Sequence, residues 1–212
     1  MDDKKIKEGL KKMRESKSRK FSQSIDLFVK IKSYSPKQDG EINIITELPN
    51  MNKKSNICAI VGPELLEDAK KSCEKVLTDK DLEKLDIKSG KKLAREFDFF
   101  VAQVQLMPKL AKNLGRILGP LGKMPNPKRG QVLSPKSDIL DVAKRLKNST
   151  KLSTKKQNAI ATKIGTEDMK DEEILANIKA VIEAIEHNIP TEHATIDTLT
   201  LKTSMGEPIK IR

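Results

Sequence analysis

The hydrophobic pattern changes its period twice along this 212-residue chain, and this change limits the folds that the chain can adopt. From residue 21 to residue 31 apolar and polar residues alternate, and Phe28 alone interrupts the alternation. Such a pattern predicts a strand with one buried and one exposed face. A turn-rich connection at residues 34–40 leads to the apolar positions of residues 42–48, which we interpret as the partner strand of a long hairpin.

Continuous apolar runs replace the alternation in the middle of the chain. Residues 57–61 form such a run, and residues 97–101 form a second one that is interrupted by Asp98; runs of this kind are typical of strands that are covered on both faces. A helical pattern follows each run, beginning at Gly62-Pro63 after the first and spanning residues 106–114 after the second. Strands that alternate with helices indicate a small, Rossmann-like α/β layer with a largely parallel sheet.

The period-two pattern returns in the last third of the chain. Residues 157–164, 195–202 and 208–211 are predicted strands. Residues 170–187 carry a single apolar stripe, which predicts a helix with one buried side. At the other end of the chain, residues 2–14 read as a short charged helix.

The N-terminal segment and the C-terminal tail each hold too little apolar surface for an independent core, so we expect them to fold together. The predicted fold class is α/β with two domains. One is a discontinuous α+β domain of residues 1–55 and 148–212, and the other is a Rossmann-like α/β domain inserted at residues 56–147.

Charge is segregated along the sequence. The chain has 42 Lys and Arg residues against 30 Asp and Glu residues, which gives a formal net charge of +12. No acidic residue lies between Asp98 and Asp138 or between Asp141 and Glu167. A surface that is basic only for solubility intersperses its charges, whereas segregation favours a phosphate backbone as the partner. The fourteen cations of these two stretches are Lys109, Lys112, Arg116, Lys123, Lys128, Arg129, Lys136, Lys144, Arg145, Lys147, Lys151, Lys155, Lys156 and Lys163.

Composition excludes several classes of protein. Aromatic residues make up only 3% of the chain, which argues against RNA readers that stack successive bases. No apolar run approaches the roughly 20 residues of a membrane helix, and the N-terminus lacks the apolar segment of a secretory signal. Two cysteines (Cys58, Cys73) and two histidines (His187, His193) are too few for a disulfide framework, a metal site or a catalytic set. We expect a soluble protein of a reducing compartment, without cofactor or metal.

Glycine, proline and cations are concentrated at residues 115–130, where no acidic residue occurs. A nucleotide phosphate loop does not fit this segment, because the glycine spacing before Gly122-Lys123 is wrong. Met124 also stands where a magnesium-binding Ser or Thr belongs. We interpret the segment as a structured basic loop that contacts nucleic acid or a neighbouring protein; the alternative is a nucleotide-binding α/β enzyme with a basic substrate domain. The cations of the loop are Arg116, Lys123, Lys128 and Arg129.

These motifs resemble one known family. The run Gly119-Pro-Leu-Gly-Lys-Met-Pro-Asn-Pro-Lys128, preceded by Asp98-Phe-Phe-Val-Ala-Gln103 and Leu106-Met-Pro108, resembles the signature of universal large-subunit ribosomal protein one, in its archaeal branch. Arg19-Lys-Phe-Ser-Gln-Ser24 is similar to that family's basic-Phe entry to the first strand. Thr203-Ser-Met-Gly206 is similar to its C-terminal Thr-Met-Gly turn. The matches follow in order over nearly the whole chain.

The resemblance implies a protein without catalytic chemistry that binds large-subunit rRNA at the base of the mobile stalk, as a monomer within the cytoplasmic ribosome. The stalk lies near the E site, and its movement helps deacylated E-site tRNA to leave. Many family members also bind their own mRNA leader and repress its translation. The RNA-binding residues that the resemblance assigns are Lys20, Phe21, Ser24, Asp26, Thr198, Thr203, Ser204, Met205 and Gly206.

The chemistry of these residues suits folded RNA. Ser24 and Asp26 have the exposed parity of the first strand, so they can offer a hydroxyl and a carboxylate to ribose 2′-OH groups. Phe21 shares the parity of the buried residues, and both core closure and RNA contact are open to it. The sequence departs from the family pattern at Glu207, where proline is usual, and at Leu121, where a cation is common.

Overall fold

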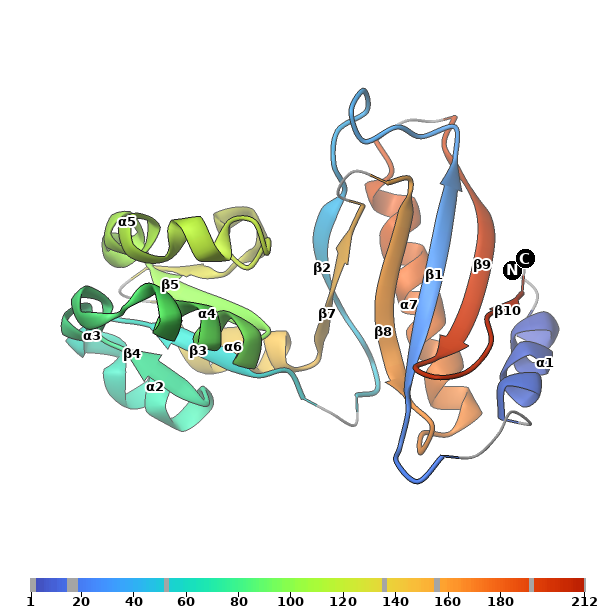
Figure 1. Ribbon diagram of the computed structural model, residues 1–212, viewed down its shortest axis with the longest axis horizontal. Coiled ribbons are helices and arrows are strands. Elements are labelled where there is room, and N and C mark those ends of the chain that lie inside the picture. The colour runs from blue at the N-terminus through green and yellow to red at the C-terminus, as the bar shows by residue number, and fades with distance from the viewer. Residues whose placement is uncertain are drawn as a thin grey trace. The chain divides into compact units, whose positions relative to one another are not determined.

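The computed structural model of the protein divides into two compact units (Figure 1), Met1–Lys53 with Asn148–Arg212, and Lys54–Lys147. The second unit is therefore inserted into the first along the chain. The residues that the structure describes are 3–14, 19–51, 54–134, 137–154, 157–190 and 193–211.

The first unit is built on a four-stranded antiparallel sheet with the order β10-β9-β1-β8 (Figure 1). Its central strand β1 is hydrogen-bonded to β8 on one side and to β9 on the other. The strands are β1 (Ser24–Lys32), β8 (Ala159–Thr166), β9 (Thr195–Thr203) and β10 (Ile209–Lys210). Strands that are far apart in the sequence therefore make up one sheet.

One face of this sheet packs against two helices, α1 (Asp3–Arg14) and α7 (Asp171–Asn188). The residues of β1 that point into the core are Ile25, Leu27, Val29 and Ile31. Both helices meet this face with an apolar stripe at helical spacing, and these stripes are the ones that the sequence pattern predicts. In Figure 1 the strands lie in front of α7.

The opposite side of β1 is polar, and we call the side of the sheet to which it belongs the open face. The side chains of β1 on the open face are Ser24, Asp26, Phe28, Lys30 and Lys32. Phe28 thus has the parity of the polar residues, and it is exposed rather than buried. Phe28 interrupts the sequence alternation only because it is an apolar residue on the solvent side. The alternation of buried and exposed side chains continues through it.

The long hairpin predicted for residues 21–48 is wrong. Strand β2 (Asn43–Glu47) pairs with β7 (Ser149–Ser153) in a separate two-stranded sheet, because both edges of β1 are occupied by β8 and β9. The connection between β1 and β2 is held by Tyr34, whose hydroxyl donates to Gly40 O at 2.5 Å and lies 3.2 Å from Thr154 Oγ1. These bonds direct β2 towards the segment at Thr154.

The second unit contains a four-stranded parallel sheet with the order β4-β3-β5-β6. Helices α3, α4 and α5 pack against one side of it around the buried Phe100, while α2 contacts α6 and α6 contacts β3. The strands are β3 (Ile57–Ile60), β4 (Lys75–Leu77), β5 (Phe99–Gln103) and β6 (Val132–Leu133). The helices are α2 (Leu66–Ser72), α3 (Asp79–Lys84), α4 (Ile87–Glu96), α5 (Met107–Leu118) and α6 (Ile139–Lys147).

Every residue of β3 and of β5 is buried, as their continuous apolar runs predict. Short 3-10 turns join these strands to the following helices, η1 (Pro63–Leu65) after β3 and η2 (Val104–Leu106) after β5. A third turn, η3 (Pro127–Arg129), lies before β6. The predicted fold class, a mixed α/β chain with a parallel sheet in one of its two parts, is confirmed.

Candidate nucleic-acid interface

Three segments of the first unit meet at one end of the four-stranded sheet: residues 19–24 before and at the start of β1, the turn 166–170 after β8, and the turn 203–206 after β9. The backbone N–H of Ser204 donates to Ser24 O at 3.1 Å, and that of Glu167 donates to Gln23 O at 3.0 Å. The N–H of Gly206 closes its own turn on Thr203 O at 3.2 Å. We call these three segments the sheet-end site.

Gln23 connects all three segments, although its side chain is buried. Its amide Nε2 donates to Glu167 Oε1 at 2.9 Å, and its Oε1 accepts the backbone N–H of Met205 at 3.0 Å. The backbone N–H of Gln23 donates to Glu167 Oε2 at 3.2 Å. The position of Met205 is therefore fixed by a hydrogen bond to the residue just before β1.

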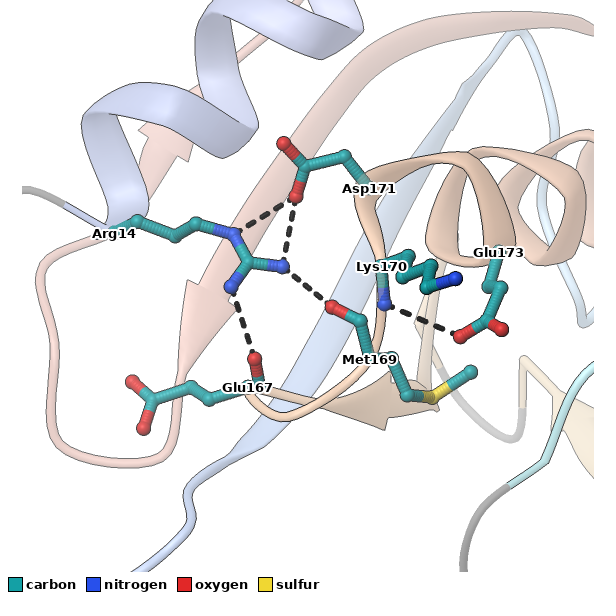
Figure 2. Close-up of polar contacts among 6 residues, drawn as sticks. All are labelled: Arg14, Glu167, Met169, Lys170, Asp171 and Glu173. Carbon is teal, nitrogen blue, oxygen red and sulfur yellow. Dashed lines mark hydrogen bonds and ion pairs between the residues drawn. The ribbon is translucent and has the colours of Figure 1, made fainter.

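Arg14, at the end of α1, holds the turn after β8 (Figure 2). Its guanidinium donates to Glu167 O at 3.0 Å, to Met169 O at 2.5 Å and to the carboxylate of Asp171 at 2.8 Å. The neighbouring N–H of Lys170 donates to Glu173 Oε2 at 3.1 Å, which completes the start of α7 (Figure 2). One arginine thus fixes the turn that carries the carboxylate partner of Gln23.

Two large apolar side chains project from this braced framework. Phe21 is 55% exposed and Met205 is 62% exposed, and the adjacent Lys20 is also exposed. Of the two roles that the sequence leaves open for Phe21, core closure is excluded, because β1 begins at Ser24 and the strand parity does not extend back to residue 21. Exposed apolar side chains next to a cation are suited to contact with sugars and bases.

The other assigned residues lie differently. Ser204 is exposed and Gly206 half-buried in the turn after β9. Thr203, in contrast, is buried, so its hydroxyl does not face the surface. Its backbone carbonyl accepts the N–H of Gly206 and so closes the turn. Thr198 pairs with Lys30 on β1. It lies five residues before Thr203 on β9, a distance of about 17 Å at the usual rise per residue of a strand. The structure thus brings seven of the nine assigned residues to the sheet-end site, places Asp26 two residues further along β1, and leaves Thr198 apart.

Asp26 lies on the open face between two lysines. Its partner on β8 is Lys163 and its partner on β9 is Lys202. Burial raises the pKa of Asp26 above its usual value, and the two lysines oppose this rise. A carboxylate in this setting repels phosphate, and it accepts a hydrogen bond only from a correctly placed donor such as a ribose 2′-OH. Asp26 therefore contributes more to selectivity than to affinity.

The basic loop of the second unit is only partly available for binding. The ammonium of Lys123 donates to Ala94 O at 3.0 Å and to Phe97 O at 2.7 Å, at the end of α4, so this residue supports the fold. Arg129 is half-buried, and burial lowers its pKa. Arg116 and Lys128 are exposed. Among the cations of the acid-free stretches, Lys136, Lys155 and Lys156 lie outside the described residues.

Residues 10–207 of the chain match the pattern of the Ribosomal protein L1p/L10e family. The chain belongs to this family. It is 40% identical to the large ribosomal subunit protein uL1 of Nanoarchaeum equitans over 95% of this chain and 97% of the relative. It is 36% identical to the uL1 protein of Korarchaeum cryptofilum, with 90% and 86% of the two chains covered, and 35% identical to that of Methanobrevibacter smithii, with 97% and 98% covered. The resemblance to the archaeal branch is confirmed.

Membership in this family makes the chain a ribosomal structural protein and not an enzyme. The geometry of the parallel sheet agrees, because ligands of such sheets bind outside the carboxyl ends of neighbouring strands at the point where the strand order reverses. Between β3 and β5 this place is filled by the buried side chain of Gln103, whose Oε1 accepts the N–H of Gly62 at 2.8 Å. The nucleotide-binding alternative is therefore not supported.

Besides the sheet-end site, the described residues hold no reactive cysteine, no cluster of metal ligands and no helix suited to cross a membrane. Cys58 and Cys73 are free and buried, and burial raises the pKa of Cys58 to about 12, which keeps its thiol protonated and unreactive. Within the described ranges, no group of His, Cys, Asp or Glu side chains is arranged to hold a metal ion. None of the helices in the described part of the chain has the length and apolar character to cross a membrane.

Proposed function

We propose that the sheet-end site binds rRNA, and that the chain serves in this way as a structural constituent of the large ribosomal subunit in the cytoplasm. The observation that carries the proposal is the pair of exposed apolar side chains, Phe21 and Met205, of which Met205 is fixed through its backbone N–H by the buried side-chain amide of Gln23. Ordinary surface residues are not braced in this way. A surface fixed before binding loses little entropy when RNA docks on it.

The site would recognise the shape of a folded RNA. Ser24 and Ser204 supply hydroxyls, and Asp26 supplies an acceptor for ribose 2′-OH groups. Lys20 supplies attraction to phosphate, while Phe21 and Met205 contact sugar or base. Most of these groups are uncharged, so the net charge of +12 governs approach and overall affinity, and the sheet-end site governs the choice of RNA.

The rRNA target that we propose is the base of the mobile stalk near the E site. The inserted unit would then assist release of deacylated tRNA, with exposed Arg116 and Lys128 as its contacts to tRNA phosphates. A leader of the protein's own mRNA that folds like the stalk base would compete for the same site and repress translation. A leader that fails to displace the rRNA fragment excludes this regulatory role.

Titration of the protein with a stalk-base rRNA fragment tests the proposal. We expect Met205→Asp, Gly206→Val and Ser24→Arg to weaken binding about tenfold or more each, because they place charge or bulk in a fixed contact surface. Lys128→Ala is the control, since this exposed lysine lies in the other unit. Equal losses from all four substitutions would contradict a localised site.

A further inference from the structure

The open face of the four-stranded sheet carries an aromatic ring that the sheet-end site does not use. Phe28 lies in the middle of β1 and is 38% exposed. Its cross-strand neighbours are Ala161 on β8 and Thr200 on β9. Both neighbours are small, so neither covers the ring. Phe28 therefore presents part of its ring to solvent in the middle of the sheet.

Lysines surround this ring on the same face. Lys163 and Lys202 are the partners of Asp26, two positions before Phe28 on β1, and Lys30 is two positions after it. Positions two apart along a strand are about 6.5–7 Å apart, and diagonal positions on neighbouring strands about 7–8 Å, so these lysines can reach the space around the ring. The lysines of the open face are Lys30, Lys32, Lys163, Lys202 and Lys210.

Few carboxylates offset this charge. Asp26 lies between Lys163 and Lys202, and Asp197 lies at the irregularity in β9, where its carboxylate accepts a hydrogen bond from Thr198. Five lysines against these two acids leave the open face basic in the part of the chain that the structure describes. A basic sheet with one accessible aromatic ring complements a polyanion whose planar groups are free to stack.

We propose that the open face binds an unpaired RNA strand, with one base stacked on Phe28 and the neighbouring phosphates paired with the surrounding lysines. A single stacked base agrees with an aromatic content too low for readers of successive bases. A base-paired helix offers no free base to the ring. An acidic protein would engage the lysines and not the ring. The proposal adds a second RNA contact next to the sheet-end site, and it shares with the proposed function the class of partner and the neighbouring Asp26.

Fluorescence anisotropy of the full-length protein with a labelled oligouridylate of about ten nucleotides, within the usual site sizes of single-strand binders, tests the role of the ring. We expect Phe28→Leu to weaken binding by about 5- to 150-fold, the range of one lost stacking contact. Phe28→Tyr keeps the ring and binds like the wild type. Ile87→Ala is the control, because it removes an exposed apolar side chain from the other unit.

Salt dependence tests the role of the lysines. We expect Lys202→Ala to lower the slope of log K against log salt by about 0.7, the value for one single-strand phosphate, while the exposed Lys91 of α4 can be replaced by alanine without effect. Wild-type affinity in Phe28→Leu, or equal slopes for the two lysine variants, overturns the proposal. Met205→Asp separates the two sites, because it should lose the stalk-base fragment and keep the oligouridylate.

Discussion

A single buried side chain, Gln23, determines the geometry of an exposed surface. Its amide bonds to Glu167 and to the backbone of Met205, which are 144 and 182 residues away in the sequence. In the sequence Gln23 is one polar residue between two serines, and nothing in that pattern distinguishes it from its neighbours. Its role follows from partners that only the folded chain brings near.

Replacement of this amide should affect both stability and binding. We expect Gln23→Leu to lower the free energy of unfolding by about 1–3 kcal/mol, because the half-buried carboxylate of Glu167 and the N–H of Met205 lose a partner. Affinity for the stalk-base fragment should fall as well. Denaturant unfolding and RNA titration measure the two effects. The exposed Gln157 gives the control, and a Gln157→Ala variant with the same losses would contradict the bracing role.

Lys123 shows the opposite error of sequence reasoning. Its place in a glycine- and proline-rich basic loop indicates a nucleic-acid contact, yet its ammonium caps the end of α4. Cations near a helix C-terminus stabilise its unpaired carbonyl groups. We therefore expect Lys123→Ala to lower the free energy of unfolding by about 1–2 kcal/mol and to leave affinity for the stalk-base fragment unchanged. Lys128→Ala, matched in charge, should alter the unfolding transition little.

At the scale of elements, the attachment of helix α1 to the turn after β8 depends on the hydrogen bonds of its last residue, Arg14. The apolar stripe of the helix packs on the sheet, but its contact with the turn after β8 is made by the fork of Arg14. A guanidinium can satisfy two carbonyls and a carboxylate at once, whereas an ammonium on a shorter reach cannot match that geometry. The helix and the sheet-end site are therefore coupled through one side chain.

Arg14→Lys should accordingly loosen α1 and the turn at Glu167 together. We expect faster amide hydrogen exchange in α1 and in residues 166–170, and a several-fold loss of affinity for the stalk-base fragment. Lys11→Ala, which removes an exposed cation from the same helix, provides the comparison. Unchanged exchange at residues 166–170 in Arg14→Lys would argue against the coupling.

Strand β1 shows how far sequence patterns reach at this scale. Alternation identifies its buried face correctly from Ile25 to Ile31, because one side must meet the helices. It does not identify the partners of β1, since an alternating strand presents the same edges to any neighbour. Strand β2 follows β1 in the sequence and still pairs with β7. Alternation also fails to predict the exposure of residues that precede the strand. Phe21 lies before the first residue of β1, and its parity would place it in the core although it is exposed.

For the whole molecule, the place where the chain enters and leaves the inserted unit is held by polar contacts. The backbone N–H of Ser55 donates to Lys147 O at 3.0 Å, and the ammonium of Lys147 pairs with Glu74 at 2.9 Å. The other carboxylate oxygen of Glu74 accepts the N–H of Ile57 at 2.7 Å. Glu74 thereby joins the first strand and the last helix of the unit.

These contacts make the stability of the inserted unit sensitive to acid. Burial by itself would raise the pKa of Glu74, but the Ile57 N–H and Lys147 outweigh it and lower the pKa below the ordinary 4.5. Such a group stabilises the folded state above about pH 4.5, and this contribution is lost as the pH falls through the folded pKa. We expect Glu74→Gln to lower the unfolding midpoint at pH 7 and to approach the wild type as the pH falls below the folded pKa of Glu74. A constant difference at all pH values would contradict this origin.

The sequence by itself determined the α/β class, the buried face of β1 and of α7, and the family, because hydrophobic period and signature motifs are local properties of the chain. Tertiary structure alone decided which strands pair, that Phe21 is exposed and Thr203 buried, and that Lys123 supports a helix while Gln23 braces the sheet-end site. Each of these depends on hydrogen bonds or packing between residues distant in the sequence. The local period of the hydrophobic pattern does not specify which distant residues form these contacts.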